Sequence, residues 1–339
     1  MSFSFIDYVV FITYIVFIVF LGLWVSRSKK GHQKDSKDYF LAGKSLPWWA
    51  IGASLIAANI SAEQFIGMSG SGFAIGLAIA SYEWMAAITL IIVGKFFLPI
   101  FIEKGLYTIP QFVEQRFSTN LKTILAIFWV ALFIFVNLTS VLFLGGKAID
   151  TIIGTGDGSL IFYAILGLAF IAAAYSLYGG LSAVAWTDAV QVALLIIGGL
   201  ITSVLALSAV TPDGGIINGI SHVFEKAPEK FHMILSRENP EFFNLPGIAV
   251  LIGGMWVANL YYWGFNQYII QRTLAAKSIK EAQKGIALAA GLKLIIPLIV
   301  VIPGIVAYVM FTQPDGTAII PGVSEAFLKA DGSVNFDKA

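Results

Sequence analysis

The sequence predicts an all-helical integral membrane protein, and three observations support that fold class. Among its 339 residues, 58% are hydrophobic and 12% are charged, whereas about a quarter of the residues in soluble domains are charged. The mean hydropathy is +0.84. The apolar stretches run unbroken for about 20 residues, the length of a helix that crosses the hydrocarbon core, and they do not alternate as strands of a membrane barrel do.

Eight stretches have the length and composition of membrane-spanning helices. They lie at residues 4–25, 48–73, 76–102, 121–145, 160–178, 185–207, 246–270 and 286–311. The first is predicted to be a retained span, because its apolar run is too long for a signal peptide and its basic neighbours, Arg27, Lys29 and Lys30, follow it. Between the third and fourth spans, residues 107–118 are short and amphipathic, which is typical of an interfacial helix.

Lysines and arginines are unevenly divided between the two sides that these spans define. The side that follows the first, third and seventh spans carries more than twice as many as the opposite side. Because cytoplasmic loops are enriched in Lys and Arg, this side is predicted to be cytoplasmic and the N-terminus external. The polar segment 211–245 then lies outside, where we expect it to form one or two short helices, and the polar tail 312–339 is external too.

Composition also excludes several classes of function. The net charge of +1 gives no indication of a nucleic-acid partner. The absence of cysteine excludes disulfides, thiol nucleophiles and cysteine-ligated metals. The histidines, His32, His222 and His232, lie outside the spans, and no acid–base or nucleophile–base pair has a spacing that supports catalysis. We therefore do not expect an enzyme.

The second span is polar and glycine-rich where a membrane helix should be apolar. Residues 59–64 contain two amides, a hydroxyl and a carboxyl group, and Gly67, Gly70 and Gly72 follow them. A helix in hydrocarbon must satisfy its own backbone, so an interruption is tolerated only where it faces protein or a watery cavity. Broken membrane helices of this kind form binding sites near the bilayer midplane.

We therefore predict a break in this span. Carbonyls freed by a break are suitable ligands for sodium, and those near Ala57 and Ile60 lie where they would bind it. The alternative is that Asn59 and Ser61 only hold neighbouring helices together and that the glycines only permit close packing.

Other ionisable and polar side chains also fall inside the predicted spans, where they are costly and usually functional. They are Glu63, Glu83, Asn137, Asp188, Asn259, Asn266, Gln267 and Lys293. Structural alternatives remain open for several of them: Asn137 could link helices, Lys293 could extend to the interface, and Glu63 could lie near a helix end.

Taken together, these residue types favour a neutral polyol as the ligand. Amides and carboxylates match the donors and acceptors of hydroxyl groups, and the aromatic rings of Tyr261, Tyr262 and Trp263 can cover a weakly polar face. An anion site would favour arginine, and no arginine lies inside a predicted span.

Several long segments resemble the solute:sodium symporter family. They are LAGKSLPWWA, GASLIAANISAEQFIGMSGSG, ASYEWM, YGGLSAVAWTDAVQ and VANLYYWGFNQYIIQRTLAAKS, and the resemblance covers the whole chain. It implies a leucine-transporter-like inverted-repeat fold in one helical transmembrane domain. Residues 4–25 would be an extra first helix, 48–207 the first repeat, and 246–311 the first two helices of a second repeat that is not completed before Ala339.

The resemblance also implies roles for individual residues. Sugar binding is implied for Gln64, Glu83, Asn137, Asn259, Lys293 and Tyr262; gating for Met68, Tyr82 and Tyr262; sodium binding for the carbonyls of Ala57 and Ile60; and a sodium exit path for Asp188. In one place the chain departs from the family's sugar-binding pattern, because Ala86 stands where a serine is expected.

The activity implied is sodium-coupled symport of a hexose, galactose or glucose, across a bacterial inner membrane. The expected partners are the hexose, Na+ as the coupling ion, and the lipid bilayer. Two alternatives stay open: a symporter of the same family for myo-inositol or another small solute, and a sodium-linked channel or sensor on the same fold.

Overall fold

The computed structural model describes residues 4–27, 35–153, 158–211, 214–245 and 247–312. Within these ranges the secondary structure is helical apart from an isolated bridge between Leu46 and Ala276. The chain divides into two compact units. The first unit comprises Met1–Glu63, Ala86–Leu194 and Val257–Lys293, and the second comprises Gln64–Met85, Leu195–Trp256 and Leu294–Ala339.

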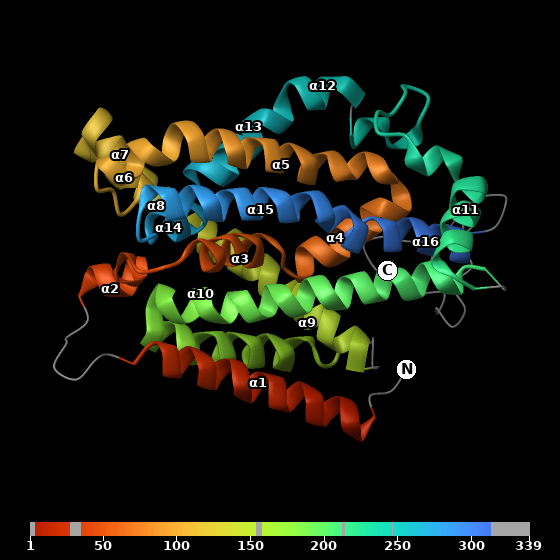
Figure 1. The fold of residues 1–339 in the computed structure, drawn as a ribbon, viewed down its shortest axis with the longest axis horizontal. Helices are drawn as coiled ribbons and strands as arrows, with labels where there is room; N and C mark the ends of the chain where they lie inside the picture. The colour runs from red at the N-terminus through yellow and green to blue at the C-terminus, as the bar shows by residue number, and fades with distance from the viewer. Residues whose placement is uncertain (1–3, 28–34, 154–157, 212–213, 246, 313–339) are drawn as a thin grey trace. The chain divides into compact units, whose positions relative to one another are not determined.

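The helices follow one another in the order shown in Figure 1. They are α1 (Phe5–Val25), α2 (Ser36–Leu41), α3 (Trp48–Asn59), α4 (Ala62–Ala74), α5 (Ser81–Ile92), α6 (Leu98–Glu103), α7 (Ile109–Arg116), α8 (Thr119–Leu132), α9 (Thr139–Ile153), α10 (Ile161–Ala209), α11 (Ile216–Lys226), α12 (Gly247–Ile252), α13 (Gly254–Leu260), α14 (Gln267–Leu274), α15 (Ile279–Val300) and α16 (Ile302–Phe311). Short 3-10 turns occupy Ala42–Lys44, Leu77–Ala80, Pro228–Phe231 and Pro240–Phe243, and π-helical turns occupy Val93–Phe97, Phe133–Leu138 and Tyr261–Phe265.

Five helical stretches in the described part of the chain are long and apolar enough to cross a membrane, and a bent pair of helices raises this to six. The stretches are Phe5–Val25, Leu77–Glu103, Thr119–Ile153, Ile161–Ala209 and Ile279–Phe311. The second predicted span consists of two shorter helices, α3 and α4, and the fifth and sixth predicted spans both lie in α10. The number of spans and their grouping into repeats remain predictions.

The predicted break in the second span is present. Helix α3 ends at Asn59, Ile60 is extended (φ −91°, ψ 105°), and α4 begins at Ala62. The interruption therefore lies at Ile60 and Ser61. An extended residue ends the ladder of i to i−4 hydrogen bonds, so the carbonyls in the last turn of α3 lose their intrahelical donors.

In the first unit, α3 and α15 run parallel and in close contact. The backbone N–H of Trp48 donates to Glu281 Oε2 at 2.9 Å. Farther along, a Cβ on Gly52 would lie 2.8 Å from the carbonyl oxygen of Gly285. This close approach brings Asn59, at the end of α3, beside Lys293, which lies two turns after Gly285 on α15.

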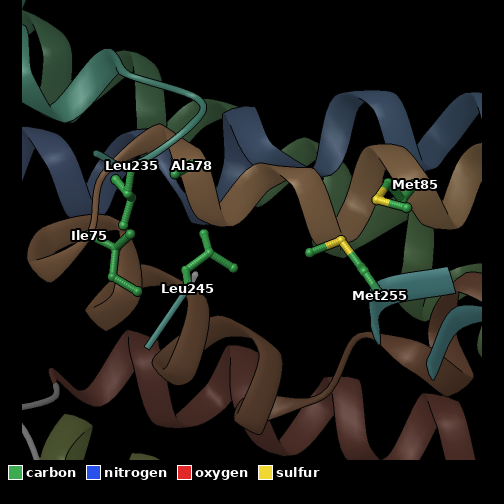
Figure 2. Close-up of a cluster of buried hydrophobic side chains, with 6 residues drawn as sticks. All are labelled: Ile75, Ala78, Met85, Leu235, Leu245 and Met255. Carbon is green, nitrogen blue, oxygen red and sulfur yellow. The ribbon is translucent and has the colours of Figure 1, made fainter. Parts of the chain in front are cut away.

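A core cluster of the second unit fastens the polar segment 211–245 to the neighbouring helices. It consists of Ile75, Ala78, Met85, Leu235, Leu245 and Met255, each at most 9% exposed (Figure 2). Leu235 and Leu245 come from the polar segment itself. Although composition predicts a soluble-like loop, burial of these two leucines gives the segment a fixed place in its unit. The external position of the segment remains a prediction.

Helix α10 bends at Gly180, which separates its two arms (Figure 1). Gly180 has φ 59° and ψ −152°, a backbone conformation open almost only to glycine. A Cβ at this position would lie 2.4 Å from the carbonyl oxygen of Tyr39. The hydroxyl of Tyr39 lies 3.2 Å from the carbonyl oxygen of Leu177 and donates to it. The bend is thus held against α2.

We expect Gly180→Ala to lower the free energy of unfolding by about 2 kcal/mol or more, because it adds both backbone strain and a clash with Tyr39. Gly167→Ala, on the first arm of α10, is the matched control, since a Cβ there meets nothing within 4 Å. The control should be neutral or stabilising by up to about 1 kcal/mol. Unfolding of the purified protein in detergent measures both, and equal stability would contradict the role of the bend.

Candidate functional site

A fully buried lysine lies at one end of a series of hydrogen-bonded polar groups in the first unit. Lys293 is 1% exposed, and its Nζ donates to Asn59 Oδ1. The same nitrogen lies 5.2 Å from the centroid of the Trp263 ring, within the range of a cation–π contact. The alternative in which Lys293 extends to the membrane interface is therefore wrong.

Asn59 joins this lysine to two tyrosines. Its Nδ2 donates to Tyr262 Oη at 3.2 Å, and Tyr262 Oη lies 2.8 Å from Tyr268 Oη in a second hydrogen bond. As the last residue of α3 before the break, Asn59 uses its amide oxygen on a cation and its amide nitrogen on a phenol. Its hydrogen bonds thus join α3 to α15 and to the π-helical turn Tyr261–Phe265, although the sequence did not mark it as a site residue.

A second interruption positions the tyrosines, and the sequence did not predict it. Tyr261–Phe265 form a π-helical turn, Asn266 is extended (φ −75°, ψ 123°), and the side chain of Asn266 accepts from the N–H of Tyr268 at 3.3 Å. Single π-helical turns are rare and frequently found at functional sites. Gly264, two residues before Asn266, was the signal that could have indicated this break.

The other amides of the first unit differ in their surroundings. Asn259 is buried, 7% exposed, in α13. Asn137 lies half-buried in the π-helical turn Phe133–Leu138, and no hydrogen bond joins it to the chain of groups from Lys293 to Tyr268. Gln267 accepts from the N–H of Ile109 at 2.8 Å, at the start of α7, which gives it a structural role.

The carbonyl pair predicted to bind sodium lies at the break. Ala57 belongs to the last turn of α3, and Ile60 is the extended residue that follows, whose N–H donates to the Ile56 carbonyl at 2.8 Å. Among the described residues, no group of three or more Asp, Glu or His side chains could hold a metal ion.

Asp188 belongs to a buried three-residue cluster that the sequence only partly predicted. Ser54 Oγ donates to Asp188 Oδ2 at 2.5 Å, and Arg272 Nε donates to Ser54 Oγ at 2.8 Å. Arg272 Nη2 lies 3.6 Å from Asp188 Oδ2, and both side chains are about nine-tenths buried. We missed Arg272, which lies two residues beyond the predicted end of the seventh span.

This cluster connects to the tyrosines, because Arg272 Nη1 donates to the backbone carbonyl of Tyr268. The residues from Lys293 through Asn59, Tyr262, Tyr268, Arg272 and Ser54 to Asp188 are therefore linked in series, with Tyr268 using its hydroxyl toward Tyr262 and its backbone carbonyl toward Arg272. The path involves α3, α10, α14 and α15 and the π-helical turn Tyr261–Phe265.

The second unit brings together three of the residues predicted to contact the sugar or to form a gate. Gln64 Nε2 lies 2.7 Å from Glu83 Oε1 and donates to it, and the same nitrogen lies 2.7 Å from Met68 Sδ. Glu83 is 4% exposed and Met68 is 8% exposed. Next to Glu83 in the sequence, Tyr82 is 41% exposed.

Two further residues can now be placed. Glu63 is exposed in the first turn of α4, where a carboxylate is favourable, so it is not the buried intramembrane charge that its position in the sequence indicated. Ala86, which replaces the expected serine, is 3% exposed in α5.

Removing either partner of the buried ion pair is expected to be costly. Asp188→Asn or Arg272→Met should each lower the free energy of unfolding by about 3 kcal/mol, because each leaves a buried charge without its counter-charge. The double variant should cost less than the sum of the two.

The pair of exposed Lys284 and half-buried Glu281, at 3.9 Å on α15, is the control for this cycle. Lys284→Met should change stability by less than about 1 kcal/mol. Additive costs for Asp188 and Arg272 in detergent-based unfolding measurements would show that the two side chains act independently.

Comparisons with known proteins identify relatives over nearly the whole chain. The sodium/glucose cotransporter of Vibrio parahaemolyticus is 64% identical over 336 residues, which cover 99% of this chain and 61% of the relative. The sodium/myo-inositol cotransporter 2 of Bos taurus is 34% identical over 310 residues, 88% of this chain and 44% of the relative. The chain thus spans less than two thirds of the length of either.

A solved structure of a Na+-coupled sialic acid symporter, in a substrate-bound outward-open state, shares the fold. Its TM-score is 0.77 at 23% identity, and the match covers 95% of this chain and 64% of the other. This likeness confirms the predicted leucine-transporter-like fold class. Residues 39–327 match the sodium:solute symporter family. Because this match covers most of the chain and the Vibrio relative is 64% identical, the chain belongs to the sodium:solute symporter family and is an integral membrane protein.

Proposed function

We propose that the complete protein is a sodium-coupled symporter that carries a hexose into the cell by alternating access. The observation that carries this proposal is the place of Asn59, the last residue before the break, whose amide joins Lys293 to Tyr262. A break that frees carbonyls can hold a cation, and amide, ammonium and phenol groups beside it can hold hydroxyls. The relatives from Vibrio and Bos taurus, named for sodium/glucose and sodium/myo-inositol cotransport, support the same activity.

The sugar is proposed to bind through hydrogen bonds from polar side chains and through contact with one aromatic face. The polar residues are Gln64, Glu83, Asn137, Asn259 and Lys293, the aromatic is Tyr262, and Met68 and Tyr82 are the proposed outer gate. Burial supports this assignment for Glu83, Asn259 and Lys293, each at most 7% exposed. Ala86 offers no hydroxyl, so the preference among sugars is expected to differ from that of relatives with a serine there.

Sodium is proposed to bind the carbonyls of Ala57 and Ile60 and to favour the state that binds sugar. By linkage, sugar then tightens sodium binding by the same factor. One charge that moves inward across 100 mV contributes about 2.3 kcal/mol, which can drive sugar against its gradient. Asp188 is the proposed acidic group on the exit path, and its release of sodium would require its contacts with Ser54 and Arg272 to loosen.

The proposed location is the inner membrane of a bacterium, with the N-terminus and the segment 211–245 outside. The excess of lysine and arginine on the opposite side supports this orientation. Sodium and the hexose are the proposed solutes and the lipid bilayer is the surrounding medium. The family consists of transporters, and nothing in it indicates an enzyme.

Myo-inositol is the second candidate solute, because it presents the same rim of hydroxyls and because a relative is named for it. A competition panel distinguishes the two: unlabelled galactose or glucose should inhibit labelled galactose uptake at lower concentrations than myo-inositol does.

Gln64→Ala and Lys293→Ala, introduced into the complete gene product, should each abolish sodium-dependent uptake of labelled galactose in proteoliposomes. Each removes a hydrogen-bonding group, buried in the case of Lys293 and half-buried in the case of Gln64, and loss of one such contact costs about 1.5–3 kcal/mol when a charged group is involved. Replacement of external sodium by choline should have the same effect on the unmodified protein.

The matched control is Lys280→Ala, which removes an exposed lysine from the same helix as Lys293. It should insert, fold and transport as the unmodified protein does. Unchanged uptake in both site variants would overturn the site assignment, and uptake that ignores sodium would overturn the proposed coupling.

A further inference from the structure

In the second unit, a lysine of the segment 211–245 reaches the ends of two helices. Lys230 lies in the turn Pro228–Phe231, and its Nζ donates at 2.6 Å to the carbonyl of Ala74, the last residue of α4. The same nitrogen lies 4.1 Å from the centroid of the Tyr308 ring on α16. We call the contact of Lys230 with Ala74 and Tyr308 the outer clamp.

Both contacts of the outer clamp depend on the positive charge. The final carbonyls of a helix lack intrahelical donors and carry partial negative charge, so an ammonium group is favourable there. An aromatic face attracts the same cation. Burial lowers the pKa of Lys230, and the nearby carboxylates of Glu229 and Glu241 act in the opposite direction.

The backbone around the outer clamp is closely packed. Gly76, with φ 90°, follows the end of α4, and a Cβ there would lie 2.3 Å from the carbonyl oxygen of Lys230. The turn that carries Lys230 therefore lies directly against the turn that ends α4. Leu235 and Leu245, farther along the same segment, are buried in one cluster with Ile75 (Figure 2).

Helix α4 is also in close contact with α16 and the end of α15. Ser69 Oγ donates to the carbonyl of Val300 at 2.8 Å, and a Cβ on Gly304 would lie 2.1 Å from the carbonyl oxygen of Ser69. Phe73 and Tyr308 meet edge to face at 5.5 Å. Tyr308 thus contacts both α4 and Lys230. The outer clamp therefore lies at the end of the contact between α4 and α16.

We propose that Lys230 is a positioning residue that holds the outer half of the broken span, α4, in place through its charge. It touches neither solute directly. It acts through α4, which also carries Gln64 and Met68, so loss of the clamp allows this helix to move away from α16. The effect on transport rests on the proposed function, whereas the effect on α4 does not.

Because the chain contains no cysteine, single introduced thiols can report on this contact. Ser69→Cys places a thiol at the contact between α4 and Val300, and Gly67→Cys places one at an exposed position on α4 where a Cβ meets nothing within 4 Å. Lys230→Met should increase the rate at which a maleimide labels Cys at position 69 by about tenfold, as expected for loss of a partly desolvated cation–π contact and a charged hydrogen bond.

Two controls define the result. The thiol at position 67 should be labelled at the same rate with and without Lys230→Met. Lys226→Met, which removes an exposed lysine from the neighbouring α11, should change the labelling rate at neither position. Labelling at position 69 that stays within twofold of the unmodified background after Lys230→Met would overturn the proposal.

A chemical rescue separates charge from packing. Lys230→Cys modified with an aminoethyl thiosulfonate regains a lysine-like ammonium, whereas modification with a propyl thiosulfonate gives a neutral chain of similar length. This variant carries no thiol at position 69, so the readout is the resistance of the α4–α16 region to proteolysis. Recovery with the aminoethyl group alone supports the proposal, and equal recovery with both groups would show that Lys230 acts by filling space.

Uptake by the complete gene product links the outer clamp to transport. Lys230→Met should raise the KM for galactose several-fold with a smaller change in kcat, because α4 is no longer held in its binding position. If the unmodified protein does not transport sugar, the proposed function fails while the labelling result still decides the role of Lys230. A normal KM together with faster labelling would confine Lys230 to structure and overturn its positioning role.

Discussion

The constraint on which this structure depends is that backbone and side-chain polar groups within a membrane must find partners inside the protein. An unbroken helix satisfies its own backbone, but the helix is interrupted at Ile60 and Ser61. A second interruption lies at Asn266. Asn59 ends the helix before the first break, and Tyr262 lies in the π-helical turn before the second. The hydrogen bond between their side chains therefore joins the two interruptions, so that the irregular segments stabilise each other.

The same constraint explains the pairing of the buried charges. Lys293 is held by an amide oxygen and an indole face, and the charges of Arg272 and Asp188 are bridged by the hydroxyl of Ser54. Buried ion pairs contribute little net stability compared with apolar packing, so their best-supported use is to specify one arrangement over another. A path of hydrogen bonds joins the two clusters through Tyr268, and such a contiguous network can carry coupling if its members have two arrangements.

The sequence located the break and the buried charges but not their partners, and the reason is physical. Polar residues and glycines within an apolar stretch are local signals, and they were sufficient to predict the break near Ala57 and Ile60 and the burial of Lys293. The hydrogen-bond partner of Lys293 and the ion-pair partner of Asp188 lie on helices more than 80 residues away, and helical periodicity does not specify which helices meet. For Glu63 the sequence left open a position near a helix end, and the residue lies in the first turn of α4. Arg272 was not predicted to be buried, because a shift of two residues at a helix end decides whether a charge is buried.

The two units differ in how they hold their helices, and the difference bears on which part can respond to a solute. In the second unit, Gly72 and Gly304 bring α4 and α16 into backbone contact, where an added Cβ would lie within 2.5 Å of Val301 or Ser69. Such a backbone contact has no side-chain hydrogen bond that a solute could replace. In the first unit, Asn59, Tyr262 and Lys293 satisfy one another through side chains. A hydroxyl group is both donor and acceptor, so a hydroxyl of the proposed sugar can replace one of these groups without leaving the others unpaired, and the exchange need cost little free energy. A transporter needs this property at its binding site, because a solute that binds by exchange can also be released by exchange.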